Sequence, residues 1–415
     1  MVIREYSKVE LVFSSSESEA VKIALVNLRR DLIRTLDCSV TAGGIIRILV
    51  GTVGNLPELD KKADISKLQA EDGTYRKEAF LIQEKDGELL IAGTDRRGTI
   101  YGIYDFCEWL GVSPWYFFAD VPVRRRSEAV IENGYCKVDY PSVEYRGIFI
   151  NDEEELEHWV WRYMGEATIG VKTYEKIFEL LLRLKLNYIW PAMHVNSFNL
   201  KQENGALANR MGIVVGTSHC DMLMRSNNRE WKPWLAKKGY TDVEYDFSIP
   251  GRNREILKEY WRESVEQNRD FEVSYTVGMR GIHDSGFETK SLEGLTGEKL
   301  LKAKIELLES VMAAQKEILS ETLDTEPMKT FVPYKEVLEL YDNGLKVPED
   351  LTLIWTNDNY GYVRRYPGEK EKARKSGNGI YYHNSYWAPP GASYLFICSI
   401  PMSHTRNELL KAYKE

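Results

Sequence analysis

The sequence predicts an α/β protein, with a small N-terminal α/β domain at residues 1–139 and a (β/α)8 TIM barrel at residues 140–415. The chain has 415 residues, more than one typical core of about 100 to 200 residues contains, so we expect two domains. After residue 143, strand-like and helix-like segments alternate over about 260 residues, which matches the length and the eight strands of a barrel. An extended, charged segment at 120–139 connects the two parts, and we place the boundary near Tyr140.

Composition and charge limit the classes of function. Hydrophobic residues at 43% and charged residues at 28% are ordinary for a soluble globular protein. The net charge of −8 argues against a nucleic-acid partner, which requires a basic surface. No apolar run is long enough to cross a membrane, and the N-terminal stretch MVIREYSKVE lacks the apolar segment of a signal peptide. We therefore expect a cytoplasmic protein without a membrane partner, or a secreted or periplasmic one if a leader has been removed.

The five cysteines point to a reducing compartment. They are widely spaced and form no CxxC or zinc-binding pattern. We expect all of them except Cys220 to be buried thiols, which favours the cytoplasm.

In the N-terminal domain, apolar periodicity predicts alternating strands and helices. Strands are expected at 9–14, 45–50, 78–83 and 89–92, and the turn at 85–87 predicts that the last two form a hairpin. A helix is expected at 17–36, with the serines at 14–16 available as caps. A second helix, starting after Gly93-Thr94-Asp95, places these residues on one apolar face: Ile103, Phe106, Cys107 and Leu110.

In the barrel, the first predicted strand is mostly apolar at 143–150, as a strand buried on both faces should be. The predicted strands are 143–152, 187–193, 212–219, 274–281, 329–336, 351–358, 379–385 and 394–401. The clearest helices between them are expected at 174–185, 253–267, 297–320 and 337–343. The chain ends inside the predicted eighth helix, so we expect a barrel truncated at its last helix.

Polar side chains follow most of the predicted strands. The first strand ends in Asn151 and Asp152, and the acidic residues at 153–157 favour the start of a helix. Because the C-terminal strand ends of a barrel meet at its catalytic face, we expect these side chains to converge. The remaining candidates are Trp190, His194, His219, Cys220, Asp221, Arg280, His283, Asp284, Lys335, Glu336, Asn357, Asp358, Asn359, Tyr381, Tyr382 and His383.

Each of these residues also has a structural interpretation. Asp284 precedes Ser-Gly and suits a turn, Glu336 suits an exposed helix position, and His219 suits a structural role. The convergence of many candidates on one face, rather than any single residue, is what indicates a site.

Carboxylates and histidines at these strand ends allow two kinds of chemistry. Two carboxylates across a pocket suit glycoside hydrolysis, in which one protonates the leaving oxygen and the other activates water or attacks carbon. Histidines at strand ends suit a metal site instead, but the chain has no HxH or HExxH spacing. It also lacks GxGxxG, GxxxxGK[ST] and GxSxG. We therefore expect no metal and no cofactor.

Several motifs, in order along the chain, resemble glycoside hydrolase family 115, the xylan α-1,2-glucuronidases. In the barrel they are RGIFINDEE (146–154), LRLKLNYIWPAM (182–193), GIVVGTSH (212–219), TVGMRG (276–281), PYKEV (333–337), LTLIWTNDNYG (351–361) and YYH (381–383). The stretch at 91–123 is similar to the first domain of that family. The resemblance covers almost the whole chain.

The resemblance implies release of glucuronic acid, or its 4-O-methyl form, from glucuronoxylan or aldouronic acids, with inversion and without metal. Carried over by motif, Glu336 is the general acid and Asp284 the general base, although these roles could be exchanged. Asp152 and Asp358 are further carboxylates of the site. An inverting pair stands about 6.5 to 9.5 Å apart to hold a water.

A uronate substrate is an anion and requires a cation or hydrogen-bond donors. Arg280 can pair with its carboxylate, His219 and Tyr381 can donate single bonds, and Trp190 can form an apolar wall. The expected substrate-binding residues are Asn151, Trp190, His194, His219, Arg280, Asp358, Asn359 and Tyr381.

Four strand-end residues depart from the pattern of the family. Cys220 and Asp221 stand where the family has His and Glu, His194 where it has Trp, and Asn357 where it tends to have Asp. Two alternatives therefore stay open: a related glycosidase with a shifted substrate, and a non-catalytic or inactive carbohydrate-binding protein. The family also carries domains after the barrel, and a homodimer is possible where they are present.

Overall fold

The structure, a computed structural model, describes residues 1–151, 153–282, 285–384 and 400–415. Asp152, His283, Asp284 and most of the predicted strand at 394–401 lie outside the described residues. The chain divides into two compact units. Unit 1 comprises Met1–Ile148, Glu155–Ile189 and Glu203–Val214, and unit 2 comprises Phe149–Glu154, Trp190–Gln202 and Val215–Glu415. The domain boundary near Tyr140 stays a prediction.

A six-stranded sheet with the order β3-β2-β4-β6-β5-β8 is the centre of unit 1. Strands β3, β2, β4 and β6 run parallel to their neighbours, whereas β5 is antiparallel to both β6 and β8. A separate antiparallel pair joins β1 to β7. The strands are β1 Val2–Arg4, β2 Lys8–Val12, β3 Ser39–Val40, β4 Ile46–Thr52, β5 Phe80–Lys85, β6 Glu88–Gly93, β7 Glu128–Val130 and β8 Cys136–Asp139.

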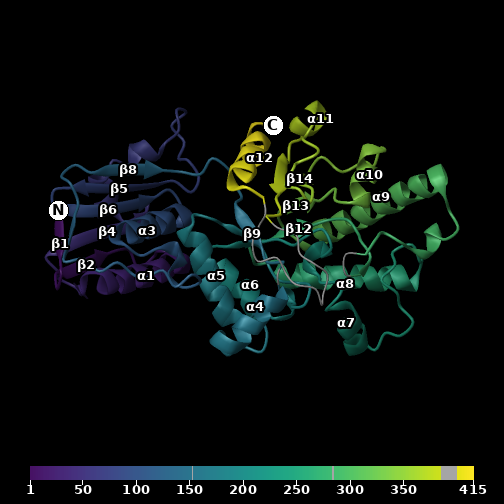
Figure 1. Ribbon diagram of the computed structural model, residues 1–415, viewed down its shortest axis with the longest axis horizontal. Helices are drawn as coiled ribbons and strands as arrows, with labels where there is room; N and C mark the ends of the chain where they lie inside the picture. Colours follow the sequence, from purple (N-terminus) through teal and green to yellow (C-terminus); the bar gives the residue numbers. More distant parts are fainter. Residues whose placement is uncertain (152, 283–284, 385–399) are drawn as a thin grey trace. The chain divides into compact units, whose positions relative to one another are not determined.

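Helices cover both faces of this sheet. Helices α1 (Glu19–Leu36) and α3 (Arg96–Leu110) lie side by side (Figure 1). The α3 helix approaches β6 so closely that a Cβ on Gly102 would lie 2.8 Å from the side chain of Ile91. Leu90 and Ala92 alternate with Ile91 and pack instead with α2 (Pro57–Lys62) and η1 (Ile65–Leu68). The alternation therefore distributes the apolar side chains of β6 between two layers of core.

The predicted elements of this region are confirmed, with two corrections. The hairpin β5–β6 turns through Asp86 and Gly87, both at positive φ, and Asp95 caps α3 by accepting from two backbone N–H groups at 2.9 Å. The cap of α1 is Ser18, not one of the serines at 14–16. The connection at 120–139 contains β7 and β8, because its extended backbone pairs with β1 and β5.

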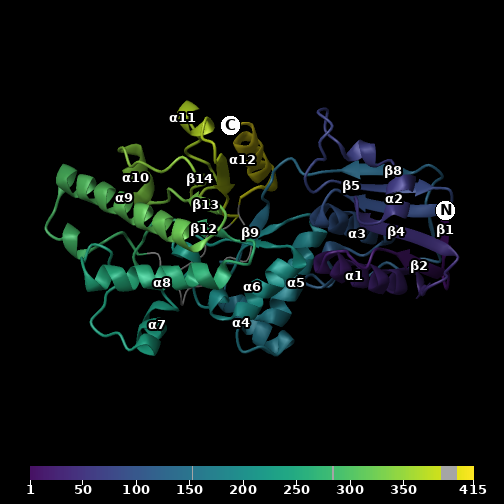
Figure 2. The same cartoon turned by 180° about the vertical axis from the view of Figure 1, so that it is seen from behind.

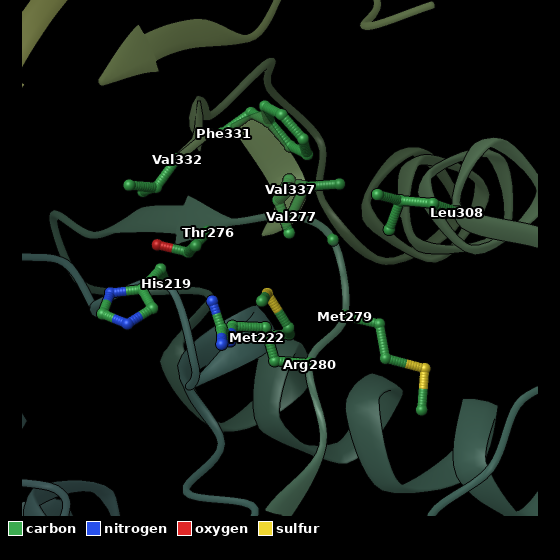
Figure 3. A pocket seen from close by; sticks show the side chains of 11 residues that line it. His219, Met222, Thr276, Val277, Met279, Arg280, Leu308, Phe331, Val332 and Val337 are labelled. Carbon is green, nitrogen blue, oxygen red and sulfur yellow. The ribbon is translucent and has the colours of Figure 1, made fainter. Parts of the chain in front are cut away.

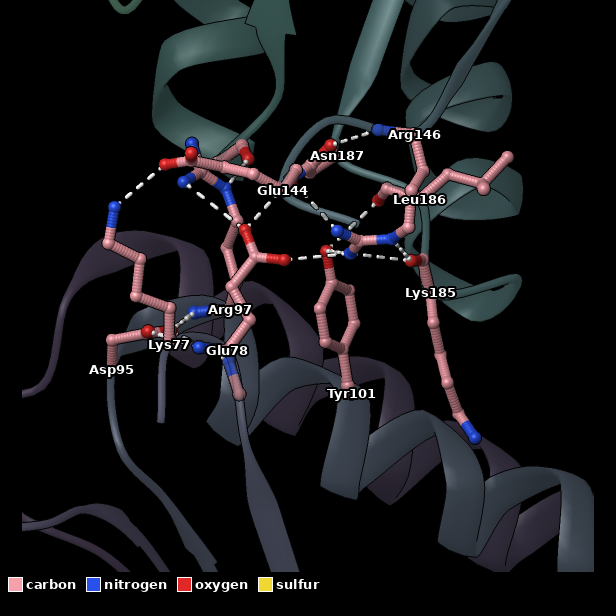
Figure 4. A network of polar contacts seen from close by, with 12 residues as sticks. Lys77, Glu78, Asp95, Arg97, Tyr101, Glu144, Arg146, Lys185, Leu186 and Asn187 are labelled. Carbon is pink, nitrogen blue, oxygen red and sulfur yellow. Dashed lines mark hydrogen bonds and ion pairs between the residues drawn. The ribbon is translucent and has the colours of Figure 1, made fainter. Parts of the chain in front are cut away.

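Arg146 holds the segment before β9 (Gly147–Phe149) to the rest of unit 1 (Figure 4). Its Nη2 donates to Glu78 Oε2 at 2.7 Å and to the Lys185 carbonyl at 2.9 Å. The Asn187 side chain donates to Glu78 Oε1 at 2.8 Å and accepts from the Arg146 backbone N–H at 2.9 Å. Glu78 is buried, so this network compensates its charge and fixes where β9 begins.

Two further sheets follow along the chain. One sheet has the order β11-β10-β9, and the other the order β12-β13-β14-β15 with all neighbours parallel. A parallel bridge between Val215 and Val273 lies between them. These strands are β10 Tyr188–Trp190, β11 Val214–Val215, β12 Ser274–Thr276, β13 Met328–Phe331, β14 Thr352–Thr356 and β15 Asn378–Tyr381. In the part of the chain that the structure describes, one closed eight-stranded barrel is not confirmed.

The strands of this region are shorter than the sequence predicts. The first was expected at 143–152, buried on both faces, but only Gly147–Phe149 pairs, and Ile148 is exposed. The residues before it are held by side-chain bonds of Arg146 to the carbonyls of Val143 and Glu144 rather than by strand pairing. Residues 400–401, the described end of the predicted last strand, are not a strand.

The long predicted helices are confirmed within a few residues. Helices α8 and α9 of unit 2 pack along each other (Figures 1 and 2). The helices after β9 are α4 Glu153–Trp159, α5 Val171–Arg183, α6 Gln202–Met211, α7 Trp231–Lys238, α8 Arg252–Asn268, α9 Gly297–Thr322, α10 Glu336–Asp342, α11 Glu369–Lys372 and α12 Met402–Lys414. The shorter ones are η2 Pro114–Tyr116, η3 Val160–Met164, η4 Phe198–Leu200, η5 Met222–Met224 and η7 Lys290–Leu292.

The cysteines of the described residues differ in burial. Cys38 and Cys107 are buried as predicted, but Cys136 is exposed because it begins the edge strand β8; Cys398 lies outside the described residues. Within the described ranges, no helix has the length and apolarity that crossing a membrane requires.

Candidate active site

Aromatic side chains from three different strands meet in unit 2. Phe149 at the end of β9, Trp190 at the end of β10 and Tyr381 at the end of β15 have ring centroids 5.2 to 5.6 Å apart. The ring centroid of Tyr381 also lies 4.1 Å from that of His383. Strand ends that are far apart in the sequence therefore converge here, as the sequence predicts for its strand-end candidates.

The ring of Tyr334, a residue that the sequence analysis did not select, contacts four of the predicted candidates. Its ring centroid lies 4.6 Å from that of His219 and 5.9 Å from that of His383. The cationic groups of Arg280 and Lys335 lie 6.0 Å and 5.2 Å from the same ring. Tyr334 belongs to the motif PYKEV, from which the sequence analysis selected only the polar residues Lys335 and Glu336.

Glu336 and Arg280 form the charged centre of this cluster. Arg280 Nη2 donates to Glu336 Oε2 at 3.2 Å, and the backbone N–H of Phe287 donates to Glu336 Oε1 at 3.3 Å. The Arg280 side chain is 3% exposed, whereas the Glu336 side chain is 26% exposed. Glu336 is therefore the more accessible partner of the pair.

The backbone at Lys335 is unusual for a residue with a side chain. Its φ of 51° and ψ of −125° place it outside the common regions, directly before α10 begins at Glu336. Such a conformation costs about 1–3 kcal/mol and is found often at functional sites, because surrounding contacts must hold it. The strain supports the interpretation of Glu336 as a functional residue.

A small cavity lies beside this cluster (Figure 3). His219 and Arg280 line it together with Thr276, Met222 and Phe331. Its volume is about 10 Å³, which is close to the minimum of about 10–15 Å³ that one water requires. The cavity is therefore a packing space below the strand ends and not a sugar-binding pocket.

Glu153 is a further residue that the sequence analysis did not select. As predicted, it begins a helix, but its carboxylate is buried and accepts four backbone N–H groups at 2.7 to 2.8 Å. The four donors are Met193, His194, Val195 and Asn196. Burial raises the pKa of Glu153, and these hydrogen bonds oppose the rise. The carboxylate thus positions the loop that carries His194.

Asp221 lies in a buried acidic group with Glu153 and Glu230. Burial and the charges of these two carboxylates raise its pKa well above the ordinary value, while Ser218 and Cys220 oppose the rise as hydrogen-bond donors. The Ser218 hydroxyl lies 3.4 Å and Cys220 Sγ 3.8 Å from Asp221 Oδ2. Glu230 in turn accepts from Arg225 at 2.8 Å. The surroundings of Asp221 therefore favour its protonated form.

The two candidates after β14 have different surroundings. Asn357 donates to the His383 carbonyl at 3.0 Å and accepts from the His383 backbone N–H at 2.7 Å, so it fixes the segment after β15. Asp358 accepts from the backbone N–H groups of Tyr360 and Tyr362 at 2.9 Å and pairs with Arg364. Burial alone would raise the pKa of Asp358, but these donors outweigh it and lower the pKa.

The structure brings together only part of the predicted site. Trp190, His219, Arg280, Glu336 and Tyr381 belong to one network of ring and charge contacts. Asn151 and Asn359 are exposed, and His194 is half-buried in the loop held by Glu153. Asp152, His283 and Asp284 lie outside the described residues. Among the described residues, no three His, Cys, Asp or Glu side chains are placed to hold a metal ion.

A guanidinium–carboxylate pair beside several aromatic rings is typical of carbohydrate-processing enzymes, because rings pack on sugar faces and carboxylates perform acid–base chemistry. The fold and these contacts define an α/β protein in which a carboxylate, a guanidinium and several rings gather at strand ends. The sequence profile described as glycosyl hydrolase family 115 matches residues 138–415, and the chain belongs to that family. The resemblance of the motifs is confirmed.

A solved structure is similar over the whole chain. It is described as a family GH115 4-O-methyl-alpha-glucuronidase with specificity for decorated arabinogalactans, and it is 35% identical with a TM-score of 0.87. The match covers 100% of this chain and 53% of the other, so the chain spans about half the length of that enzyme. No curated protein matches the chain.

Two further solved structures are more distant. One is a GH138 enzyme targeting pectin rhamnogalacturonan II, at 13% identity and a TM-score of 0.47, covering 85% of this chain and 39% of its own. The other is a beta-N-acetylhexosaminidase from Bacteroides fragilis, at 13% identity and a TM-score of 0.46, covering 86% and 67%. Similarity at this level supports no conclusion about function.

Proposed function

We propose that the chain is the catalytic part of an inverting exo-glycosidase that releases α-1,2-linked glucuronic acid, or its 4-O-methyl form, from xylan or xylo-oligosaccharides. The observation that carries the proposal is the pair of Arg280 and Glu336 among converging aromatic rings, in a chain of family 115. The pair offers a cation for a uronate and a carboxylate for acid–base chemistry.

Each residue has a proposed role. Glu336 is the general acid that protonates the leaving oxygen, and Asp284 is the general base that activates water, with Asp152 as a further carboxylate of the site. Arg280 supplies the cation for the uronate carboxylate, and Trp190 and Tyr381 form part of the wall for the sugar. The substrate contacts also include Asn151, His194, His219, Asp358 and Asn359.

For residues 140–415 the (β/α)8 barrel stays our proposal. The parallel order of β12 to β15 and the parallel bridge between Val215 and Val273 support it. The ring contact between Phe149 and Tyr381, 5.6 Å apart, also supports it, because it joins the first and the last described strands.

A second candidate substrate comes from the similar enzyme. That enzyme is described as specific for decorated arabinogalactans, and it shares 35% identity with this chain. Uronates on arabinogalactan side chains offer the same anionic group to Arg280, so the two substrates differ in the sugar to which the uronate is attached.

The first experiment follows uronic acid release by NMR from 4-O-methyl-glucuronoxylan, aldouronic acids and uronate-decorated arabinogalactan. We expect the β-anomer to appear before mutarotation produces the α-anomer, since water attacks from the face opposite the leaving group. First appearance of the α-anomer would contradict inversion. Release from none of the three substrates by the folded protein would contradict the α-glucuronidase activity itself.

The roles of the carboxylates are tested with Glu336→Gln and Asp284→Asn. Glu336→Gln should lose about 10²–10⁴-fold in rate on natural substrates but retain much of its rate on an aryl uronide, whose leaving group needs no proton. Asp284→Asn should lose activity on both. Glu339→Gln is the matched control, because Glu339 is exposed on the same helix α10. The reverse pattern would exchange the two roles.

A further inference from the structure

Unit 1 contains a cavity of about 220 Å³ on the face of its sheet that α3 covers. Ile82 on β5, Leu89 on β6 and Phe106 on α3 form its apolar part. Ile82 is paired with Lys137 on β8, so their side chains share that face of the sheet. At about 30 Å³ for each water, the cavity has space for about seven waters, which is the size of one sugar ring.

One polar group at the cavity is held rigidly. Asp105, which lines it from α3, is 8% exposed and is bonded by both oxygens to Lys137 Nζ at 2.8 and 2.7 Å. Lys185 Nζ lies 2.7 Å from the same carboxylate. Two ammonium groups thus compensate the charge, so Asp105 needs no cationic ligand. Its oxygens keep acceptor positions for hydroxyl groups, because an ionised carboxylate accepts about four hydrogen bonds.

Three further polar groups at the cavity make no side-chain bond to any described residue. They are the indole N–H of Trp109, the hydroxyl of Tyr135 and the carboxylate of Glu132. Trp109 is held in place by Phe106, stacked at 5.6 Å, and by the Arg126 guanidinium at 5.7 Å. A pocket can fix the orientation of a small polyhydroxylated ligand with a few polar groups around an apolar floor. Here these groups are a rigid donor, a hydroxyl and an acceptor.

We propose that this cavity of unit 1 binds one neutral sugar ring of a carbohydrate chain. The C–H face of the ring would lie on Ile82, Leu89 and Phe106, and its hydroxyls would bond to Asp105, Trp109, Glu132 and Tyr135. The carboxylate of Glu132, whose charge no described cation compensates, disfavours a uronate. The site is therefore non-catalytic, uses none of the residues proposed for catalysis, and does not rest on the proposed activity.

Binding is measured on the full chain by saturation-transfer NMR with methyl β-xyloside and methyl β-galactoside, neither of which carries a uronate. We expect saturation transfer and a dissociation constant in the millimolar range for at least one of them. Trp109→Ala should weaken binding roughly tenfold or more, because it removes both ring contact and a donor. The double variant Glu132→Gln/Tyr135→Phe, which removes no buried apolar contact, should weaken it as well.

The controls separate a built site from a general surface effect. Trp115→Ala should bind the glycosides like the wild type, because Trp115 is 45% exposed in unit 1 and does not line the cavity. With methyl β-glucuronide, saturation transfer should be the same for the wild type and for Trp109→Ala. Absence of transfer from both neutral glycosides, or equal loss in Trp109→Ala and Trp115→Ala, would overturn the proposal. Uronic acid release tests the catalytic residues independently of these outcomes.

Discussion

Asp221 illustrates how much a single buried carboxyl can depend on its neighbours. Burial, followed by the charges of Glu153 and Glu230, raises its pKa well above the ordinary value. The unfolded chain releases this proton at a lower pH than the folded protein does. As the pH rises above the unfolded pKa, the unfolded state is therefore favoured, and the folded protein loses stability.

Asp221→Asn removes this loss, because the amide cannot ionise and still accepts from Ser218. We expect the melting temperature of the variant to exceed that of the wild type by about 1 °C at about pH 7, since about 1 kcal/mol corresponds to roughly that shift in a chain of this length. Near pH 4 the difference should disappear. Differential scanning calorimetry at both pH values measures it.

Asp270→Asn is the matched control for this substitution. Asp270 is exposed at the end of α8 and has no ion pair with any described residue, so its replacement should change the melting temperature equally at both pH values. If Asp221→Asn raised the melting temperature equally at both pH values, that result would contradict a raised pKa of Asp221.

At this scale the sequence indicated the polar residues of the cluster better than the residues that support them. Arg280, His219 and Glu336 were recognisable as polar residues after apolar strands, and the structure places them around one ring. That ring, Tyr334, was not predicted, because an aromatic residue at a strand end is equally suited to a core. The role of Glu153 was hidden for a similar reason: acidic residues at helix starts usually face solvent.

At the scale of elements, Glu153 joins the start of α4 to a loop that lies 40 residues further on. Its carboxylate accepts all four backbone N–H groups from Met193 to Asn196, at 2.7 to 2.8 Å. These donors follow the end of β10. Glu153 thus binds the N–H groups of the loop, while Asn228 and Arg229 donate to the His194 carbonyl.

Glu153→Gln should destabilise the protein by about 2–4 kcal/mol, because an amide nitrogen replaces one acceptor and leaves buried donors unsatisfied. We expect a lower urea midpoint and faster hydrogen exchange at residues 193–196, measured by mass spectrometry. Glu154→Gln changes the adjacent, half-exposed residue and should leave both quantities unchanged. Unchanged exchange at 193–196 in Glu153→Gln would show that the loop is held by other contacts.

Long helices were predicted from the sequence more accurately than short strands. Long amphipathic helices such as α8 and α9 carry several turns of periodicity, and their ends were predicted within a few residues. Strands β7 and β8 were missed because three or four residues carry too little periodicity, and their pairing with distant strands decides their structure. The same reason explains why β9 is shorter than its apolar sequence suggested.

At the scale of the whole molecule, one buried ion cluster couples folding to acid. In unit 1, Arg183 connects Asp31 of α1 to Glu179 of α5, at 2.6 Å and 2.9 Å. Arg30 adds a bond of 2.7 Å to Glu179, whose side chain is only 4% exposed. Burial alone would raise the pKa of Glu179, but Arg183 and Arg30 outweigh it and lower the pKa to about 2.

The stability that this carboxylate contributes has a defined pH window. The folded pKa lies below the unfolded value, so the contribution is complete above about pH 4.5 and is lost as the pH falls towards about 2, about 3 kcal/mol in all. Arg183→Met removes the main opposing charge. We expect a loss of about 3–5 kcal/mol at neutral pH, because two buried carboxylates each lose one of their two arginine partners.

The variant should then lose less additional stability between pH 4.5 and 2 than the wild type does, because Arg30 alone lowers the pKa of Glu179 less than Arg30 and Arg183 do together. Urea unfolding followed by circular dichroism across this range measures both effects. Arg29→Met, an exposed position on the same helix α1, should reproduce the wild-type curve. Parallel curves for Arg183→Met and the wild type would mean that acid acts through other carboxylates, since a group without a shifted pKa cannot couple folding to protons.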